Sequence, residues 1–449
     1  MYNRSELPVF PAPKRVVKEN GRYLTLSPFT RYELIIHIPE SEQEHPEVAG
    51  ALADLRQKLS DCFCMGGETK ADAELTVEVT LNEPESKADC VPAQDVSDQE
   101  YHIVVQSSPA HIAISAYGRQ GLRYAVTSMG QLLRSDNNAV RIPEIEFMDW
   151  PSIKERGLSL EGALSTMYMT KADWFEFIDY LAELKFNTLI VTVYNGWYVQ
   201  FDGEVRQTLL VPFKNYPQLA TPTYIKYYSP EQHKWIGKRV LPYMFAEDLL
   251  GEVAAYARRK SIRIIPGVNS LSHNTLIPSA IPEVSALNED GEPELLGFCT
   301  RNPKTYELLF KIYDEIIDRY LLPNGLDTIN PGLDEVWEGI GGNAEDIFRV
   351  RSDWCRCETC RQYSKIDNFL DFILKIVGYL KQRGIKAMMA VDVLLGGYDD
   401  DPRYKVDGQG LLDRFATRLE EAGMKEWLSL IWWYYTELVS SSPFTDTRP

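Results

Sequence analysis

The sequence has no run of apolar residues that approaches the ~20 needed to cross a membrane, and it has no low-complexity tract. The segment from Met1 to Phe10 carries charge and proline where a signal peptide needs an apolar stretch, so we expect a cytoplasmic protein. Basic residues are scarce, because 47 Lys and Arg stand against 65 Asp and Glu, a net charge of −18. Nucleic acids and anionic membranes both require a basic face, so neither is an expected partner.

Cysteine is also scarce, and the count of seven is odd. An odd count does not suit a disulfide framework and fits a reducing compartment. The stretch Cys355-Arg-Cys357-Glu-Thr-Cys360 resembles part of a zinc site. Zinc usually takes four ligands, and the fourth would have to come from Cys299 or a distant histidine. The sequence alone favours three reduced thiols at the start of a helix, with no metal bound.

A chain of 449 residues is too long for one ordinary core, so two or three domains are expected. Residues 1–150 are typical of an α+β unit, with no catalytic constellation, and we expect an accessory domain that braces the next one. Apolar periodicity predicts its strands and helices. The strands are residues 32–38, 74–80, 101–106 and 111–116, the last two forming a hairpin, and the helices are residues 46–62 and 121–134.

From about residue 151 to 449, strands alternate with helices, which is typical of parallel α/β architecture. The predicted strands are residues 158–160, 188–194, 262–266, 326–330, 387–391 and 428–432. The predicted helices are residues 170–184, 247–259, 305–321, 368–382 and 411–422, and Thr170 with Asp173 is a capping signal for the first. Six βα steps in one direction predict a TIM-type (β/α)8 barrel, the catalytic domain.

Polar and aromatic residues follow each predicted strand, where a barrel has its active site. They are Glu161; Asn195 and Trp197; Asn269 and His273; Asp334, Glu335 and Trp337; Asp392; and Trp433, Tyr434 and Tyr435. A sheet without a catalytic role has no reason to concentrate such residues at one edge. Their convergence predicts an enzyme.

The most specific motif at this edge is Asp334-Glu335, which follows the strand end Asn330-Pro331-Gly332. Where the backbone leaves the sheet, two adjacent acids can reach one cavity. Carboxylates held close together have pKa values that move apart, so one stays charged and the other donates a proton. The alternative is that the pair caps the next helix, where anions favour the positive end of the dipole.

Aromatic residues crowd this edge and the long insertion of residues 195–243. Flat rings beside carboxylates suit a sugar, although most insertion tyrosines are better explained by a small satellite core of their own. Glycoside hydrolysis uses an acid and a second carboxylate, and in the substrate-assisted variant the acetamido group of the sugar is the nucleophile. Adjacent carboxylates suit that variant, because neither of them has to attack the anomeric carbon from the face opposite the other.

The segment Asn330-Pro-Gly-Leu-Asp334-Glu335 resembles the His/Asn-x-Gly-x-Asp-Glu motif of glycoside hydrolase family 20, the β-N-acetylhexosaminidases. Segments of the N-terminal domain, the barrel entry and strands three and six agree in order: residues 120–133, 142–143, 149–151, 156–157, 266–273 and 430–433. The resemblance implies that Glu335 is the general acid/base and that Asp334 positions the acetamido group. It also implies that His273 supports them and that Trp433 lines the pocket.

The substrate-binding set expected from the strand ends and this resemblance needs no cofactor. Its members are Glu161, Asn195, Trp197, Asn269, His273, Trp337, Asp392, Trp433 and Tyr435. The expected substrate is a carbohydrate with a terminal N-acetylhexosamine. A homodimer is left open.

Three departures from the family pattern keep alternatives open. The family has Leu-Asp-x-x-Arg after strand one, where this chain has Leu160-Glu161-Gly-Ala-Leu164 and no arginine. Acidic and histidine residues after strand two are replaced by residues 194–197, Tyr-Asn-Gly-Trp. Strands seven and eight have no room before Pro449, so we expect a fragment, an open barrel, or a barrel completed by another chain. The alternatives are a related glycosidase with altered sugar specificity, an inactive carbohydrate-binding protein, and a zinc-dependent hydrolase.

Overall fold

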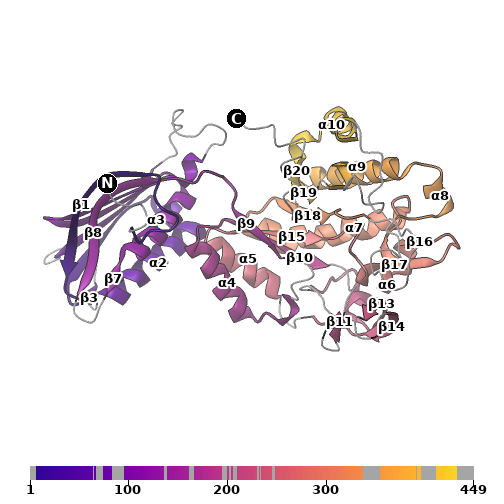
Figure 1. The fold of residues 1–449 in the computed structure, drawn as a ribbon, viewed down its shortest axis with the longest axis horizontal. Coiled ribbons are helices and arrows are strands. Elements are labelled where there is room, and N and C mark those ends of the chain that lie inside the picture. The colour runs from indigo at the N-terminus through magenta and orange to yellow at the C-terminus, as the bar shows by residue number, and fades with distance from the viewer. Residues whose placement is uncertain are drawn as a thin grey trace.

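A computed structural model of the chain describes most of its residues. They are residues 7–63, 65–66, 74–82, 96–135, 139–160, 166–194, 200–201, 204–205, 210–229, 232, 234–244, 248–336, 354–390, 392–395 and 411–431. Two large sheets organise them, one in each of two lobes (Figure 1). No helix in the described part of the chain is both long and apolar enough to span a bilayer.

The N-terminal lobe is an eight-stranded mixed sheet in the order β1-β8-β5-β6-β4-β2-β3, with β7 paired to β8. The strands are β1 (Arg15–Leu26), β2 (Arg31–His37), β3 (Met65–Gly66), β4 (Leu75–Leu81), β5 (Tyr101–Ser107), β6 (Ala110–Ala116), β7 (Arg134–Ser135) and β8 (Val140–Asp149). The helices are α1 (Glu40–Gln43), α2 (Pro46–Cys62) and α3 (Arg119–Leu132). Figure 1 shows α2 and α3 on the face of the sheet that is turned toward the second lobe.

The predicted strands and helices of this lobe are confirmed, including the antiparallel hairpin of β5 and β6. These strands could be predicted because apolar and polar residues alternate along them: Leu75, Val77 and Val79, on one face of β4, are fully buried. The sequence does not predict β1 and β8, the two longest strands. In β1 only Leu24 is buried, so the strand lacks an apolar period, and in β8 Pro143 interrupts the pattern.

The second lobe has a six-stranded sheet in which every pair is parallel, in the order β9-β10-β15-β18-β19-β20. Its strands are β9 (Gly157–Leu160), β10 (Thr188–Tyr194), β15 (Arg263–Val268), β18 (Thr328–Gly332), β19 (Lys386–Ala390) and β20 (Leu428–Ile431). The intervening helices are α4 (Lys171–Glu183), α5 (Leu249–Arg259), α7 (Pro303–Ile316), α9 (Lys365–Gln382) and α10 (Leu411–Glu421). The six predicted strands and the five predicted helices between them are therefore confirmed, as is the capping box of Thr170 and Asp173.

The described strands form an open sheet and not a closed barrel. Every residue of the inner strand β10 is buried, as is typical of a parallel strand covered on both faces. At the two edges, Leu158 of β9 is 42 % exposed and Leu430 of β20 is 43 % exposed. The predicted TIM-type barrel, of which the sequence shows six strands, is thus present as a half-barrel sheet within the described residues.

The described parts of the long insertion pack onto the main core. Leu210, Phe213 and Ile225 are buried in the same apolar cluster as the inner strands β10 and β15. This differs from the satellite core expected for most insertion tyrosines: Tyr216 packs against the same cluster, and Tyr224 is largely exposed. The insertion includes the short strands β11 (Gln200–Phe201) and β12 (Glu204–Val205) and the hairpin of β13 (Thr223–Ser229) and β14 (Lys234–Val240).

The segment between β15 and α7 forms a small structure that the sequence does not predict. It contains the short helix α6 (Leu276–Ala280) and the antiparallel hairpin of β16 (Ser285–Leu287) and β17 (Pro293–Phe298). The hairpin lies close in the chain to the loop that follows β15, and it ends one residue before Cys299.

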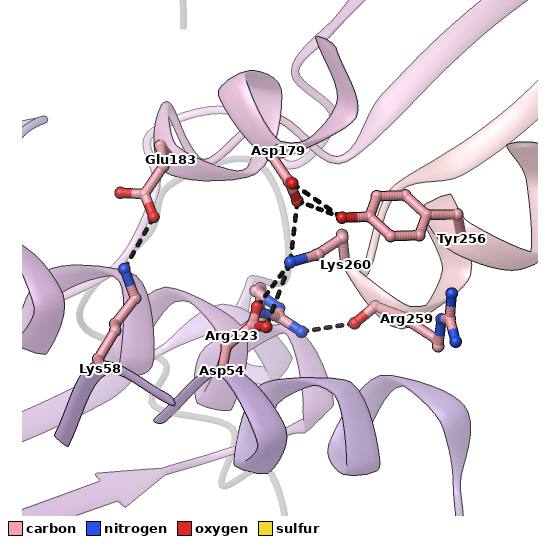
Figure 2. A network of polar contacts seen from close by, with 8 residues as sticks. All are labelled: Asp54, Lys58, Arg123, Asp179, Glu183, Tyr256, Arg259 and Lys260. Atoms are coloured by element: carbon pink, nitrogen blue, oxygen red, sulfur yellow. Dashed lines mark hydrogen bonds and ion pairs between the residues drawn. The ribbon is translucent and has the colours of Figure 1, made fainter. Parts of the chain in front are cut away.

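A network of polar contacts joins the two lobes (Figure 2). Lys260 Nζ, at the end of α5, lies 2.9 Å from Asp54 of α2 and 2.9 Å from Asp179 of α4. Arg123 of α3 donates to Asp54 and to the backbone carbonyl of Arg259, and its side chain is only 3 % exposed. Burial works to raise the pKa of Asp54, but Arg123 and Lys260 outweigh it and lower that pKa. Breaking such a buried pair leaves a charge uncompensated, so the network holds the lobes in one arrangement.

Candidate active site

The backbone turns sharply directly after β18. Gly332, Leu333 and Glu335 have φ angles of 74°, 73° and 44°, in the left-handed region that non-glycine residues seldom adopt. Glycine is required at position 332 for a second reason, because a Cβ there would lie 2.6 Å from Asn269 Oδ1. Strained backbone held in place by its surroundings is typical of functional sites.

This turn brings the side chains of Asp334 and Glu335 to the same group. Nε2 of His273 lies 3.5 Å from Asp334 Oδ2 and 3.2 Å from Glu335 Oε2. The three side chains are 14 %, 18 % and 24 % exposed for His273, Asp334 and Glu335. The two acids therefore converge on one imidazole, and His273, which has a φ of 49°, contacts both of them.

Asp392 lies two residues past the end of β19 and contacts the backbone of Glu335. Its Oδ2 accepts a hydrogen bond of 2.8 Å from the backbone N–H of Glu335, and the residue is 5 % exposed. Its Oδ1 is buried and has no hydrogen-bond partner among the described residues. This geometry favours a positioning role for Asp392 over direct contact with a sugar.

Three carboxyl groups in one small volume cannot all carry a charge at low cost. Burial, together with the charge of Asp334, raises the pKa of Asp392 to about 7. Burial also raises the pKa of Asp334, with a contribution from the charge of Glu335 and an opposing one from His273. The site therefore holds a proton at a pH where exposed aspartates hold none.

Replacing Asp392 by asparagine should flatten the pH dependence of stability. Because its pKa is about 7 in the folded chain and 3.8 when unperturbed, Asp392 favours the folded state fully below about pH 4. That contribution is lost as the pH rises to about 7. Between pH 4 and pH 8, the unfolding free energy of the Asp392→Asn variant should therefore rise by up to about 4 kcal/mol relative to that of the unmodified protein at the same pH. Urea unfolding at pH values from 4 to 8 measures this.

The matched control for this experiment is Asp290→Asn, which changes an exposed aspartate in a loop. Its unfolding free energy should follow that of the unmodified protein at every pH. Parallel curves for the Asp392→Asn variant and the unmodified protein would contradict a raised pKa at Asp392.

The loop after β15 supplies the support for the acids. Ser272 Oγ donates to the backbone carbonyl of Asp334, and the Ser270 N–H donates to Pro331 O over 2.9 Å. Asn269 is 6 % exposed, lies against Gly332, and its carbonyl accepts a 2.8 Å hydrogen bond from Asn274. The sequence predicts Asn269 as a sugar ligand, whereas its burial favours a supporting role. The sequence does not predict a role for Ser270 or Ser272, because a serine in a polar loop has no pattern that distinguishes a supporting residue from an ordinary loop residue.

Several predicted site residues lie outside the described part of the chain. They are Glu161, Asn195, Trp197, Trp337, Trp433 and Tyr435. Their roles as sugar ligands stay predictions. The described residues thus supply the acids and their support.

The fold and this site together define a class: a parallel α/β protein of TIM-barrel type with paired carboxylates at the carboxyl end of its fourth strand. Residues 156–406 match the catalytic domain of glycosyl hydrolase family 20, and residues 6–150 match domain 2 of the same family. The chain belongs to glycosyl hydrolase family 20.

Named relatives agree with this family. A beta-hexosaminidase of Vibrio furnissii is 25 % identical over 254 residues, 54 % of this chain and 38 % of that protein. A beta-hexosaminidase of Akkermansia muciniphila is 24 % identical over 290 residues, 60 % of this chain and 50 % of that protein. The chain thus spans half the length or less of these relatives.

Solved structures share the fold. The β-N-acetylhexosaminidase of Bacteroides fragilis has a TM-score of 0.60 at 19 % identity, over 96 % of this chain and 76 % of that one. The exo-β-N-acetylglucosaminidase of Vibrio harveyi, solved with N-acetylglucosamine, has a TM-score of 0.60 at 17 % identity, over 87 % and 55 %. The fold is therefore that of a TIM-barrel-like catalytic domain preceded by an N-terminal domain.

Proposed function

We propose that the protein is an exo-glycosidase that removes a terminal β-linked N-acetylhexosamine with retention of configuration. The observation that carries this proposal is the meeting of Asp334 and Glu335 at His273, at the carboxyl end of β18 in a family 20 chain. Both acids are adjacent in the chain and contact the same imidazole. This arrangement suits the mechanism in which the acetamido group of the substrate is the nucleophile, because neither carboxylate then has to attack the anomeric carbon.

In the first step the Glu335 carboxyl group donates its proton to the glycosidic oxygen, and the bond from that oxygen to the anomeric carbon breaks. The acetamido carbonyl oxygen forms a new bond to this carbon from the opposite face, which gives a cyclic oxazolinium ion. The aglycone leaves as an alcohol. The Asp334 carboxylate accepts a hydrogen bond from the acetamido N–H and stabilises the positive charge of the ring.

In the second step water attacks the anomeric carbon on the face that the aglycone left. The Glu335 carboxylate takes a proton from this water, and the ring opens to restore the acetamido group. Two inversions give net retention. His273 holds both carboxylates in position, and Asp392 holds the backbone of Glu335 through its N–H.

Four chromogenic substrates test the proposal: a β-N-acetylglucosaminide, a β-N-acetylgalactosaminide, and the matching β-glucoside and β-galactoside. Because an intramolecular nucleophile has a large effective concentration, kcat/KM for an N-acetyl substrate should exceed that for its plain counterpart by at least about 100-fold. Equal cleavage of the plain glycosides would contradict acetamido participation. It would favour a related glycosidase of altered specificity, as the missing arginine after β9 allows.

A thiazoline analogue of the cyclised sugar separates the remaining outcomes. Binding of this analogue, measured by calorimetry, without hydrolysis of any of the four substrates would identify a carbohydrate-binding protein and overturn the enzymatic proposal. Absence of both binding and hydrolysis would overturn the choice of sugar as well.

A further inference from the structure

Four cysteines of the second lobe form a cluster, and none of them is adjacent in sequence to Asp334 or Glu335. The Sγ atoms of Cys299, Cys355, Cys357 and Cys360 all lie within 4.8 Å of one another. Cys299 follows β17, Cys355 and Cys357 precede the short helix α8 (Glu358–Arg361), and Cys360 lies in it. Between 56 and 61 residues separate Cys299 from the other three, so the cluster is a product of the tertiary fold.

The separations fit a single ion at the centre. Cys299 Sγ lies 3.8 Å from Cys357 Sγ and 3.7 Å from Cys360 Sγ. Four sulfurs placed tetrahedrally at the Zn–S bond length of about 2.3 Å lie about 3.8 Å apart. A disulfide would bring two sulfurs to about 2.0 Å, and all of these cysteines are free thiols.

Backbone N–H groups are directed at two of the sulfurs. The N–H of Leu287 donates to Cys355 Sγ over 3.3 Å, and the N–H of Cys360 donates to Cys357 Sγ over 3.4 Å. Such donors stabilise sulfur as a thiolate, which is the form that binds metal. They are the outer contacts that orient ligands around a bound ion.

The surrounding backbone holds the ligands rigidly. The N–H of Arg356, between two of the cysteines, donates to Leu287 O over 2.8 Å, and Asn368 Nδ2 donates to Cys360 O over 2.9 Å. Cys299 and Cys360 are buried, at 5 % and 2 % exposed, while Cys355 and Cys357 are half-buried. A site built this way is preorganised for its ligand.

We propose that Cys299, Cys355, Cys357 and Cys360 bind one Zn²⁺ ion as a closed structural site. Four thiolates complete the tetrahedral shell and leave no position for water, so the ion has no part in hydrolysis. It ties the β16–β17 hairpin to the chain entering α9, the helix that follows the catalytic strand β18. The proposal differs from the sequence expectation of three reduced thiols, and it does not depend on the proposed glycosidase activity.

The test is elemental analysis of the purified protein, prepared without chelator. We expect one zinc per chain, and less than about 0.1 zinc after Cys360→Ser, since three thiolates hold zinc less well. The matched control is Cys62→Ser, which changes a partly buried cysteine at the end of α2 and should keep one zinc. Retention of full zinc by the Cys360→Ser variant would overturn the four-cysteine assignment.

A second measurement uses the unmodified protein and does not depend on whether a variant folds. After exchange of zinc for Co²⁺, the protein should show the intense visible bands and sulfur charge-transfer band of tetrahedral tetrathiolate cobalt. Thermal unfolding should move to lower temperature after chelation and recover when zinc is restored. Purified protein with neither zinc nor a cobalt spectrum would overturn the proposal. Two disulfides found by mass spectrometry, or iron found in place of zinc, would do the same.

Discussion

Replacing Glu335 by glutamine is expected to lower kcat for a β-N-acetylglucosaminide by about 1000-fold or more. Glutamine keeps the size of the side chain and can keep a hydrogen bond to His273, but its amide is too weak an acid to protonate the glycosidic oxygen. General acid–base catalysis contributes about 10²–10⁴-fold to the rate. Because the proton is transferred only in the transition state, its loss should lower kcat more than it changes KM. Steady-state kinetics at saturating substrate measures this.

Comparing two leaving groups tests whether Glu335 acts as the acid. A nitrophenolate departs without protonation, whereas the alcohol of a disaccharide requires it. The loss in the Glu335→Gln variant should therefore be larger for a disaccharide than for the nitrophenyl substrate. Glu176→Gln, an exposed glutamate of α4, is the matched control and should keep full activity. Equal losses for both leaving groups would contradict the role of Glu335 as the acid.

Replacing Asp334 by asparagine should lower kcat by about 10²–10³-fold, the size of effect seen when one stabilising group of a charged intermediate is removed. Asparagine cannot supply the negative charge that stabilises the oxazolinium ring, and it also changes the contact with His273. KM should change much less than kcat, because the charge forms only during reaction.

Substrates with a progressively fluorinated acetamido group show whether that group reacts. Fluorine weakens the carbonyl oxygen as a nucleophile, so kcat/KM of the unmodified protein should fall steeply along the series. The control Asp413→Asn, an exposed residue of α10, should give the same slope as the unmodified protein. A flat series in the unmodified protein, or a Asp334→Asn variant that differs only in KM, would contradict substrate assistance.

Much of the site could be predicted because parallel strands end at a common edge. Asn269, His273, Asp334, Glu335 and Asp392 were each expected from their place just past a strand, and the structure brings them into one cluster. Their individual roles were harder to predict. Asp392 and Asn269 were both expected to contact sugar, but their burial against Glu335 and Gly332 depends on how β19 and β15 flank β18.

Features without a local period could not be predicted. The strand β1 is exposed over nearly its whole length, so its residues carry no alternation, and its pairing with β8 is visible only in the assembled sheet. Most insertion tyrosines were expected in a small core of their own, yet Tyr216, Phe213 and Ile225 pack with the core of the barrel lobe. Which surface an apolar side chain meets is a property of packing and not of spacing.

By itself the sequence determined the alternation of strands and helices, the helix cap at Thr170 and the acidic pair past the fourth strand. These depend on side chains only a few residues apart, whose relation a helix or a strand sets directly. Only the tertiary structure decided that both acids contact one imidazole and that Asp392 accepts a hydrogen bond from the backbone of Glu335. It alone also brought Cys299 to three distant cysteines. Contacts across such sequence distances arise when the strands and loops pack, and no local period records them.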